Sequence, residues 1–299
     1  MYVVALGAAA GGGFPQWNSN SQSCNRARAG DPAAQPRIQA GLAVSGDRKR
    51  WFLLNASPDL RSQIGGSVFL NPRGAVRSSP IQGVVLTGGD VDVIAGLLTL
   101  RERQPLTVFA TGAIQDVLAA NPIFEVLARD VVRRAVVPLD TPVKLDDSLA
   151  VELFAVPGKM PLYLESDANP PIATGDLTVG AAVSDGRRTL FYIPGCAAMT
   201  PALAARLRDA DLVFFDATLW SDDEMIQQGL GTKTGRRMGH MSVSGPDGTI
   251  ASFKDLGVKR KVLIHLNNSN PVLLEDSSER AEAVAAGWEV AYDGMEIVL

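Results

Sequence analysis

The pattern of hydrophobic and polar positions predicts strands and helices that alternate along most of the chain. Short apolar or alternating runs, each closed by glycine or polar residues, predict strands at residues 2–7, 42–45, 51–56, 84–86, 106–110, 151–156, 178–183, 189–193, 211–215 and 262–266. Apolar residues at helical spacing predict helices at residues 60–64, 94–101, 113–120, 202–207, 225–228 and 277–286. Residues 288–299 are predicted to form a closing hairpin.

Both halves of the chain place strands first and helices after, with no tandem repeat of fixed period and no flexible linker between them. Two sheets packed back to back with helices outside would bury such a pattern. We therefore predict an α/β fold, an αββα sandwich, formed by a single domain over residues 1–299. The length and a hydrophobic content of 46% are ample for its core.

The stretch at residues 84–102 is the centre of this organisation. An apolar strand stops at Thr87-Gly88-Gly89, Asp90 and Asp92 follow, and the period then becomes helical. One interpretation is that both carboxylates only cap the helix and complement its dipole. The alternative is that they converge on a ligand at the mouth of a sheet, because one helix start rarely needs two carboxylates.

Charge and composition exclude several classes of function. A net charge of −4 and a pI near 5.3 give no electrostatic footprint for nucleic acid. No apolar run approaches the ~18–20 residues that span a bilayer, and no Lys or Arg precedes Arg26, as a signal peptide would require. Only Cys24 and Cys196 are present, which favours a reducing compartment. We expect a soluble cytoplasmic protein.

Both histidines of the chain stand in contexts that favour chemistry. His265 ends a predicted strand, His240 lies in a loop poor in core-forming residues, and Asp216 ends a third strand. A single histidine is more often a structural residue, so each alone carries little weight. Together with Asp90 and Asp92, they supply two imidazoles and three carboxylates for a metal. This donor set suits non-haem iron, and zinc or manganese would also accept it.

Thr87-x-x-Asp90-x-Asp92-Val93 followed by Gly96-Leu97 resembles a divergent copy of the T-H-x-H-x-D-H metal loop of the metallo-β-lactamase fold. More closely, the chain resembles the PqqB family of pyrroloquinoline quinone (PQQ) biosynthesis proteins. The matching stretches are AGGGFPQWN, LLNASPD, GLLTLRE, VPGK, YIPGC, GTKTGRRMGH and HLNNSNPVLLEDS, which together span nearly the whole chain.

The resemblance implies a metal-dependent hydroxylase that inserts oxygen into a tyrosine-derived ring of a PQQ precursor. Its metal would be Fe(II), held by Asp90, Asp92, Asp216, His240 and His265. His240 or Asp92 would then move protons as catalytic residues. The alternative is a carrier that binds PQQ or its precursor without catalytic metal, in transport toward the periplasm. The expected partner is PQQ or its precursor in either case. The protein could act as a homodimer or as a single chain.

Two departures from the family pattern matter. The family usually has Cys-x-Cys-x-x-Cys after PQWN, a structural zinc site, where this chain has Ser19, Ser21 and Cys24. One thiolate cannot replace three, so we predict no structural zinc there. The family also has histidine where this chain has Val93, and a valine donates no lone pair. This loss weakens the expected metal site.

A basic segment supplies candidates for substrate binding. Lys233, Arg236 and Arg237, with Lys159, would receive the carboxylates of a polyacid precursor, because guanidinium groups bind carboxylates bidentately. The alternative is an ordinary solvated run of charge. Asn267 and Asn268, in the polar turn after His265, are further candidates for substrate contacts. Cys196 is expected to be a small buried residue rather than a nucleophile.

Overall fold

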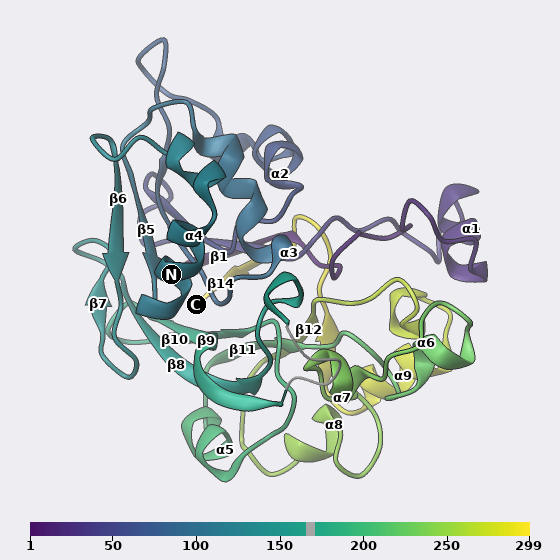
Figure 1. Ribbon diagram of the computed structural model, residues 1–299. Helices are drawn as coiled ribbons and strands as arrows, with labels where there is room; N and C mark the ends of the chain where they lie inside the picture. Colours follow the sequence, from purple (N-terminus) through teal and green to yellow (C-terminus); the bar gives the residue numbers. More distant parts are fainter. Residues whose placement is uncertain (166–170) are drawn as a thin grey trace.

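A computed structural model describes residues 1–165 and 171–299 of the chain. Its strands form two seven-stranded sheets, and Figure 1 shows helices such as α4 (Gly112–Ala120) and α5 (Pro201–Leu207) lying beyond them on opposite sides. The predicted αββα sandwich is therefore confirmed.

The first sheet is built from the N-terminal half of the chain and closed by its last strand. Its order is β14 (Glu296–Val298), β1 (Tyr2–Gly7), β2 (Gly41–Ser45), β3 (Trp51–Leu54), β4 (Ile81–Val85), β5 (Leu106–Ala110) and β6 (Val132–Val136). The strands from β3 to β6 run parallel, and the pairs β14–β1, β1–β2 and β2–β3 run antiparallel.

The second sheet repeats this plan with the second half of the chain. Its order is β13 (Trp288–Val290), β12 (Lys261–Ile264), β11 (Leu212–Asp216), β10 (Thr189–Ile193), β9 (Ala173–Ser184), β8 (Ala150–Gly158) and β7 (Val143–Lys144). The strands β10 to β13 run parallel, and β7 to β10 run antiparallel. Each half thus contributes antiparallel strands first and parallel strands after.

The helices are short and surround the two sheets. Besides α4 and α5, they are α1 (Gln22–Arg28), α2 (Leu60–Gly66), α3 (Val91–Ile94), α6 (Glu224–Gln227), α7 (Gly235–Met238), α8 (Thr249–Ser252) and α9 (Ser278–Ala285). Thr200 accepts a hydrogen bond from the Leu203 amide at 3.1 Å and caps α5, and Pro201 opens the helix.

The core lies between the sheets and beneath the helices. Strands β3 and β11 are buried at every position, because a sheet covered on both faces requires apolar side chains in both directions. Phe52, Phe154 and Phe214 are among the largest side chains that are fully buried. Burial on this scale is the main force that holds the two sheets together.

The helix predicted at residues 94–101 is wrong in part. A single α-helical turn, α3, is followed by the 3₁₀ segment η2 (Ala95–Leu100). The Ala56 amide donates to the Val93 carbonyl, and the Gly96 amide donates to the Ala56 carbonyl, each at 2.8 Å. These bonds to a neighbouring segment take backbone groups that a regular α-helix would use.

The predicted closing hairpin at residues 288–299 is also wrong. Strand β13 pairs with β12 in the second sheet, and β14 pairs with β1 in the first. The connection crosses between the sheets: the Ala291 amide donates to Leu263 and the Gly294 amide donates to Ala5. The apolar pattern of the two strands is correct, but pattern alone does not identify a strand's partner.

The basic segment predicted as a loop contains the helix α7, capped by the Thr234 side chain at the Arg237 amide. Gly239 ends this helix with a φ of 91°, a left-handed conformation that glycine adopts without steric cost. The chain then turns back, and His240 donates its amide hydrogen to the Gly235 carbonyl at 2.9 Å. The turn directs His240 toward the carboxyl end of β11.

Candidate metal centre and substrate cavity

Asp216 and His265 meet because they end neighbouring parallel strands. Asp216 is the last residue of β11 and lies opposite Ile264, the last residue of β12, so His265 follows directly beside it. The carboxyl ends of parallel strands are where ligand sites form in α/β folds. His265 has a φ of 63°, an uncommon backbone conformation for histidine that is concentrated at functional sites.

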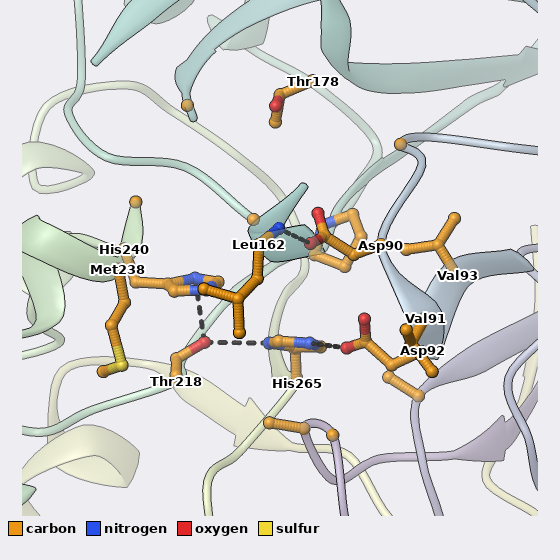
Figure 2. A pocket seen from close by; sticks show the side chains of 18 of the residues that line it. Asp90, Val91, Asp92, Val93, Leu162, Thr178, Thr218, Met238, His240 and His265 are labelled. Atoms are coloured by element: carbon orange, nitrogen blue, oxygen red, sulfur yellow. Dashed lines mark hydrogen bonds and ion pairs between the residues drawn. The ribbon is translucent and has the colours of Figure 1, made fainter. Parts of the chain in front are cut away.

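His240 completes a cluster of three potential metal ligands. Its Nδ1 lies 2.7 Å from Oδ2 of Asp216, which is fully buried. One ligand atom each from Asp216, His240 and His265 can be chosen so that all lie within 4.8 Å of one another. Figure 2 shows the two imidazoles side by side, and their ring centroids are 5.3 Å apart.

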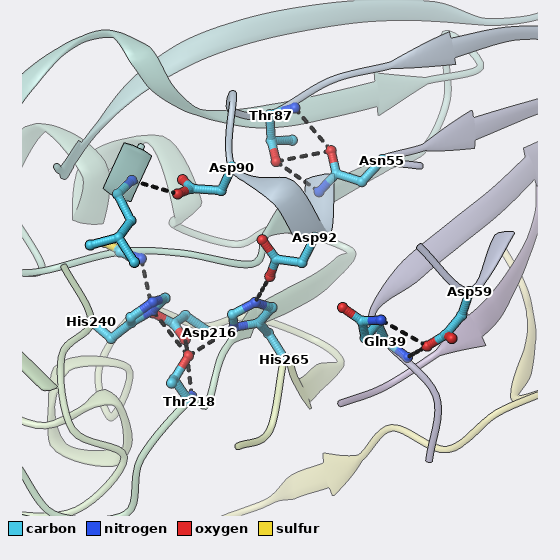
Figure 3. A network of polar contacts seen from close by, with 12 residues as sticks. Gln39, Asn55, Asp59, Thr87, Asp90, Asp92, Asp216, Thr218, His240 and His265 are labelled. Carbon is cyan, nitrogen blue, oxygen red and sulfur yellow. Dashed lines mark hydrogen bonds and ion pairs between the residues drawn. The ribbon is translucent and has the colours of Figure 1, made fainter. Parts of the chain in front are cut away.

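Thr218 connects the members of this cluster. Its hydroxyl donates to Oδ1 of Asp216 at 2.7 Å and lies 3.0 Å from Nδ1 of His240 and 2.8 Å from Nδ1 of His265 (Figure 3). One small side chain therefore fixes both rings. The sequence analysis missed Thr218, although its place two residues after Asp216, at the same strand end, is a usable signal.

Asp92 reaches the cluster from the other sheet. Its Oδ2 lies 2.9 Å from Nε2 of His265 (Figure 3). Burial alone would lower the pKa of His265, but the hydrogen bond and negative charge of Asp92 outweigh burial and raise it. Burial would likewise raise the pKa of Asp92, and the contact with His265 lowers it instead. The contact therefore favours the charged forms of both groups.

Asp90 lies in the same cavity but outside the close cluster. Its Oδ1 accepts a hydrogen bond of 3.4 Å from the Leu162 amide, and burial, reinforced by the charge of Asp92, raises its pKa. The two carboxylates do more than cap α3. The Asp90 side chain makes no cap hydrogen bond, and Asp92 contacts His265. The capping interpretation is therefore wrong.

A cavity of about 570 Å³ opens in front of these residues. Its walls combine amide, hydroxyl, cationic and apolar side chains; the lining includes Gln16, Gln39, Asn55, Thr87, Asp90, Asp92, Val93, Lys159, Leu162, Tyr163, Tyr192, Thr218, Met225, Lys233, His240, His265 and Asn267. Asn55 is fixed by Thr87, whose amide and hydroxyl both donate to Oδ1 of Asn55, at 2.9 and 3.1 Å.

The predicted substrate-binding residues divide into two groups. Lys159, Lys233 and Asn267 line the cavity. Arg236 is exposed, and Arg237 lies 3.2 Å from Glu165; neither is among the described residues that line it. Asn268 is buried behind the wall, where it donates to Gln16. Glu165, Asn55 and Tyr192 were not predicted as site residues. Asn55 and Tyr192 lie in the family stretches LLNASPD and YIPGC, whereas no motif marks Glu165.

The segment that holds Ser19, Ser21 and Cys24 is organised by hydrogen bonds. Ser21 caps α1 by accepting from the Cys24 amide at 3.3 Å, and its own amide donates to Oγ of Ser19. The buried thiol of Cys24 lies 3.6 Å from Oδ1 of Asn268. These contacts replace the three thiolates of the family pattern. The absence of structural zinc remains a prediction.

Cys196 has the character expected of a buried residue. It is fully buried, and burial raises the pKa of its thiol to about 12. Its Sγ lies 3.3 Å from the Ala198 carbonyl, and its amide donates to Oδ2 of Asp216 at 2.9 Å. A thiol with this pKa is a poor nucleophile. Cys196 instead helps to position Asp216.

The donor set fits a divalent transition metal. Two imidazoles and a carboxylate from separate segments converge on one point, with Asp92 beside them, and such sets bind iron, zinc or manganese. Asp216 is held by the amides of Cys196 and Thr218, which orients a ligand before it binds metal. Val93 lines the cavity and adds no donor.

The fold and this cluster define a protein of the metallo-β-lactamase class. Residues 50–266 match the family model of the beta-lactamase superfamily domain. A diphosphatase of the PhnP family shares the fold with a TM-score of 0.69 at 17% identity, covering 100% of this chain and 97% of that chain. At this identity the likeness shows the fold alone.

Closer relatives identify the family within this class. The chain is 60% identical to coenzyme PQQ synthesis protein B of Gluconacetobacter diazotrophicus, covering 99% of this chain and 98% of that protein. It is 53% identical to the protein of the same name from Xanthomonas axonopodis pv. citri, over 100% of both. The crystal structure of Zn(2+)-bound PqqB from Methylobacterium extorquens superposes with a TM-score of 0.98 at 51% identity over 100% of both chains. The chain belongs to the PqqB family, coenzyme PQQ synthesis protein B.

Within the described residues, no helix is both long and apolar enough to cross a membrane. This agrees with the sequence, where no apolar run reaches the necessary length.

Proposed function

We propose that this chain, which acts in PQQ biosynthesis, is a metal-dependent hydroxylase of the tyrosine-derived ring of a PQQ precursor. The observation that carries the proposal is the convergence of Asp216, His240 and His265 within 4.8 Å at the wall of a cavity large enough for a small molecule. Relatives named for PQQ synthesis support the pathway, and the zinc-bound PqqB of Methylobacterium extorquens supports metal binding in the family.

The side chains of the cavity have separable roles in this proposal. Asp216, His240 and His265 would hold the metal, and Fe(II), when bound, supplies the activation of dioxygen. Lys159 and Lys233 bind the carboxylates of the precursor and set the position of its ring. Positioning of this kind converts a bimolecular reaction into an effectively unimolecular one, and this lowers the activation barrier.

Proton movement is assigned to the residues that bracket the cluster. Asp92 lies 2.9 Å from Nε2 of His265, and Asp216 lies 2.7 Å from Nδ1 of His240. Asp92, which is not among the three proposed ligands, is assigned to accept and release protons, with His240 as the alternative. Thr218 keeps both rings oriented throughout.

The second candidate is a carrier that binds PQQ or its precursor without turnover. The observation that favours it is Val93, which lines the cavity where the family pattern has a histidine. A carrier needs the cationic wall and the cavity but no metal. Cytoplasmic location and a homodimeric state are further predictions for either function.

Metal analysis of protein purified without oxygen separates the two functions. We expect about one equivalent of iron and hydroxylation of the precursor when air is admitted. Asp216→Asn, which keeps the shape of the residue and removes its charge, should lose both. If the metal-free protein binds PQQ and no added metal gives turnover of the precursor, the protein is the carrier. Val93→His then tests whether the missing donor limits iron content.

A further inference from the structure

Glu165 binds two cations at the edge of the substrate cavity. Its Oε1 lies 2.7 Å from Nζ of Lys159, and its Oε2 lies 3.2 Å from Nη2 of Arg237. The side chain of Glu165 is 7% exposed, against 13% for Lys159 and 18% for Arg237. The hydrogen bond from Lys159 holds the pKa of Glu165 below its usual value. A half-buried carboxylate therefore neutralises two of the cations expected to bind substrate, Lys159 and Arg237.

The segment that carries Glu165 covers the cavity rather than belonging to its core. Leu162 and Tyr163 line the cavity, yet these residues are 59% and 43% exposed. The Tyr163 hydroxyl donates to the Gly89 carbonyl at 2.6 Å, and the Leu162 amide donates to Asp90. Figure 2 shows Leu162 reaching across toward the two imidazoles. Residues 160–165, the strap, therefore rest on the loop that bears Asp90 and Asp92.

The cationic wall is only partly neutralised by the strap. Lys233 lines the cavity, and none of the described residues offers it an ion pair or a hydrogen bond. A cation on an apolar cavity wall attracts an anionic ligand. The Glu165 ion pairs also contribute little net stability, because water screens the attraction of a partly exposed pair. Such a contact is readily exchanged for another carboxylate of the same geometry.

We propose that Glu165 is an internal competitor, whose carboxylate occupies the place that a ligand carboxylate takes against Lys159 and Arg237. A ligand with several carboxylates would displace Glu165 and lift the strap, while another of its carboxylates binds Lys233. This inference rests on the proposed binding of PQQ or its polyacid precursor and deepens it. Ligands with one carboxylate gain less, because they exchange one ion pair for another without reaching Lys233.

The test compares binding of PQQ to metal-free protein and to Glu165→Gln by calorimetry. Removing the competing charge should tighten PQQ binding about tenfold, which corresponds to about 1.4 kcal/mol. The neutral trimethyl ester of PQQ should bind both proteins equally. Glu152→Gln is the matched control, because Glu152 pairs with Arg206 outside the described lining of the cavity.

Two further variants keep the result interpretable. Glu165→Gln/Arg237→Gln should lose the gain, because the cation that the ligand would inherit is gone. Thermal unfolding of each variant checks that it folds, and Glu165→Ala serves if Glu165→Gln does not. If folded Glu165→Gln binds PQQ with unchanged or weaker affinity, the proposal that Glu165 competes with the ligand is wrong. If PQQ and its ester bind all variants alike, or PQQ binds none, carboxylate recognition in the proposed function fails as well.

Discussion

Thr218 shows how one residue sets the chemistry of the site. Its single hydroxyl hydrogen donates to Asp216, so it accepts from Nδ1–H of His265, while Nδ1–H of His240 donates to Asp216. This assignment leaves Nε2 of His240 as a ligand nitrogen. Nε2 of His265 lies against Asp92 and would become a ligand nitrogen once its proton passes to Asp92. The orientation of both imidazoles thus depends on a residue that binds no metal in the proposal.

Thr218→Val should weaken metal binding without removing a ligand. Valine has the shape of threonine but cannot hold either ring, and the loss of such supporting contacts costs about 10–100-fold in metal affinity. The measurement is a competition titration with a chromophoric chelator. Thr218→Ser retains the hydroxyl and is expected to bind metal nearly as the unmodified protein does; equal affinities in all three would contradict the positioning role.

Glu224, which lies outside the metal cluster, makes the stability of the fold depend on pH. It is 4% exposed, it accepts the Trp220 amide at 2.7 Å, and burial raises its pKa to about 7. The folded state therefore keeps this proton at pH values where the unfolded chain has lost it. The associated stability is fully present below about pH 4.5 and is lost as the pH rises through about 7.

Glu224→Gln should remove this dependence. Relative to the variant, the unmodified protein should lose about 3 kcal/mol of unfolding free energy between pH 4.5 and 7, since each pKa unit is about 1.4 kcal/mol. Denaturant unfolding at several pH values measures the difference between the two proteins, which cancels the contribution of all other groups. A difference that does not change with pH would show that Glu224 ionises normally.

At the scale of elements, the position of Asp92 depends on a close backbone contact. Asp92 lies in α3, and the following segment packs so tightly that a Cβ on Gly96 would lie 2.1 Å from the Ser57 carbonyl oxygen. Backbone atoms cannot move aside as a flexible side chain can. The geometry of the metal loop is therefore coupled to the packing of its neighbour.

Gly96→Ala should destabilise the protein by about 1–3 kcal/mol or more, because it overpacks this contact. Gly65→Ala is the matched control: a Cβ there meets nothing within 4 Å, and removing a glycine that is not left-handed stabilises by about 0.4–1 kcal/mol. Thermal and denaturant unfolding compare the two variants. Two alanine variants of equal stability would show that the segment adjusts freely.

Most elements could be predicted from the sequence, because strands buried on both faces have continuous apolar runs, as β3 and β11 do. The elements that were missed are short and locally weak. The four-residue helix α7 has no apolar periodicity, and it depends on the Thr234 cap and the Gly239 turn. The segment after α3 is 3₁₀ because of bonds to Ala56, which no local pattern reveals.

At the scale of the whole molecule, the last strand joins the two ends of the chain. Strand β14 pairs with β1, and the terminal amine of Met1 donates to the Leu299 carbonyl and to Asp185, in the turn between β9 and β10 of the second sheet. The C-terminal half of the chain therefore supplies a strand to the first sheet as well as the whole second sheet. We propose on this ground that residues 1–299 form one cooperative domain.

Ile297→Ala tests the closure of the first sheet. Ile297 is 2% exposed, whereas Val298, the next residue of β14, is 63% exposed. Truncating the buried side chain should cost about 2–5 kcal/mol, and Val298→Ala should change stability by less than about 0.5 kcal/mol. A single unfolding transition that shifts as a unit would support one domain; a transition that splits in two would contradict it.

The amino-acid sequence by itself determined the layers, most strands and the residues able to bind metal, because these depend on local pattern and on chemical type. Only the tertiary structure decided which residues meet. Asp92 and His265 are 173 positions apart and touch at 2.9 Å, since the segment after β4 of one sheet meets the end of β12 of the other. The pairing of β13 and β14 with separate sheets and the capture of Lys159 by Glu165 have the same cause. Contacts between distant segments are selected by packing in three dimensions, and a linear pattern carries no record of them.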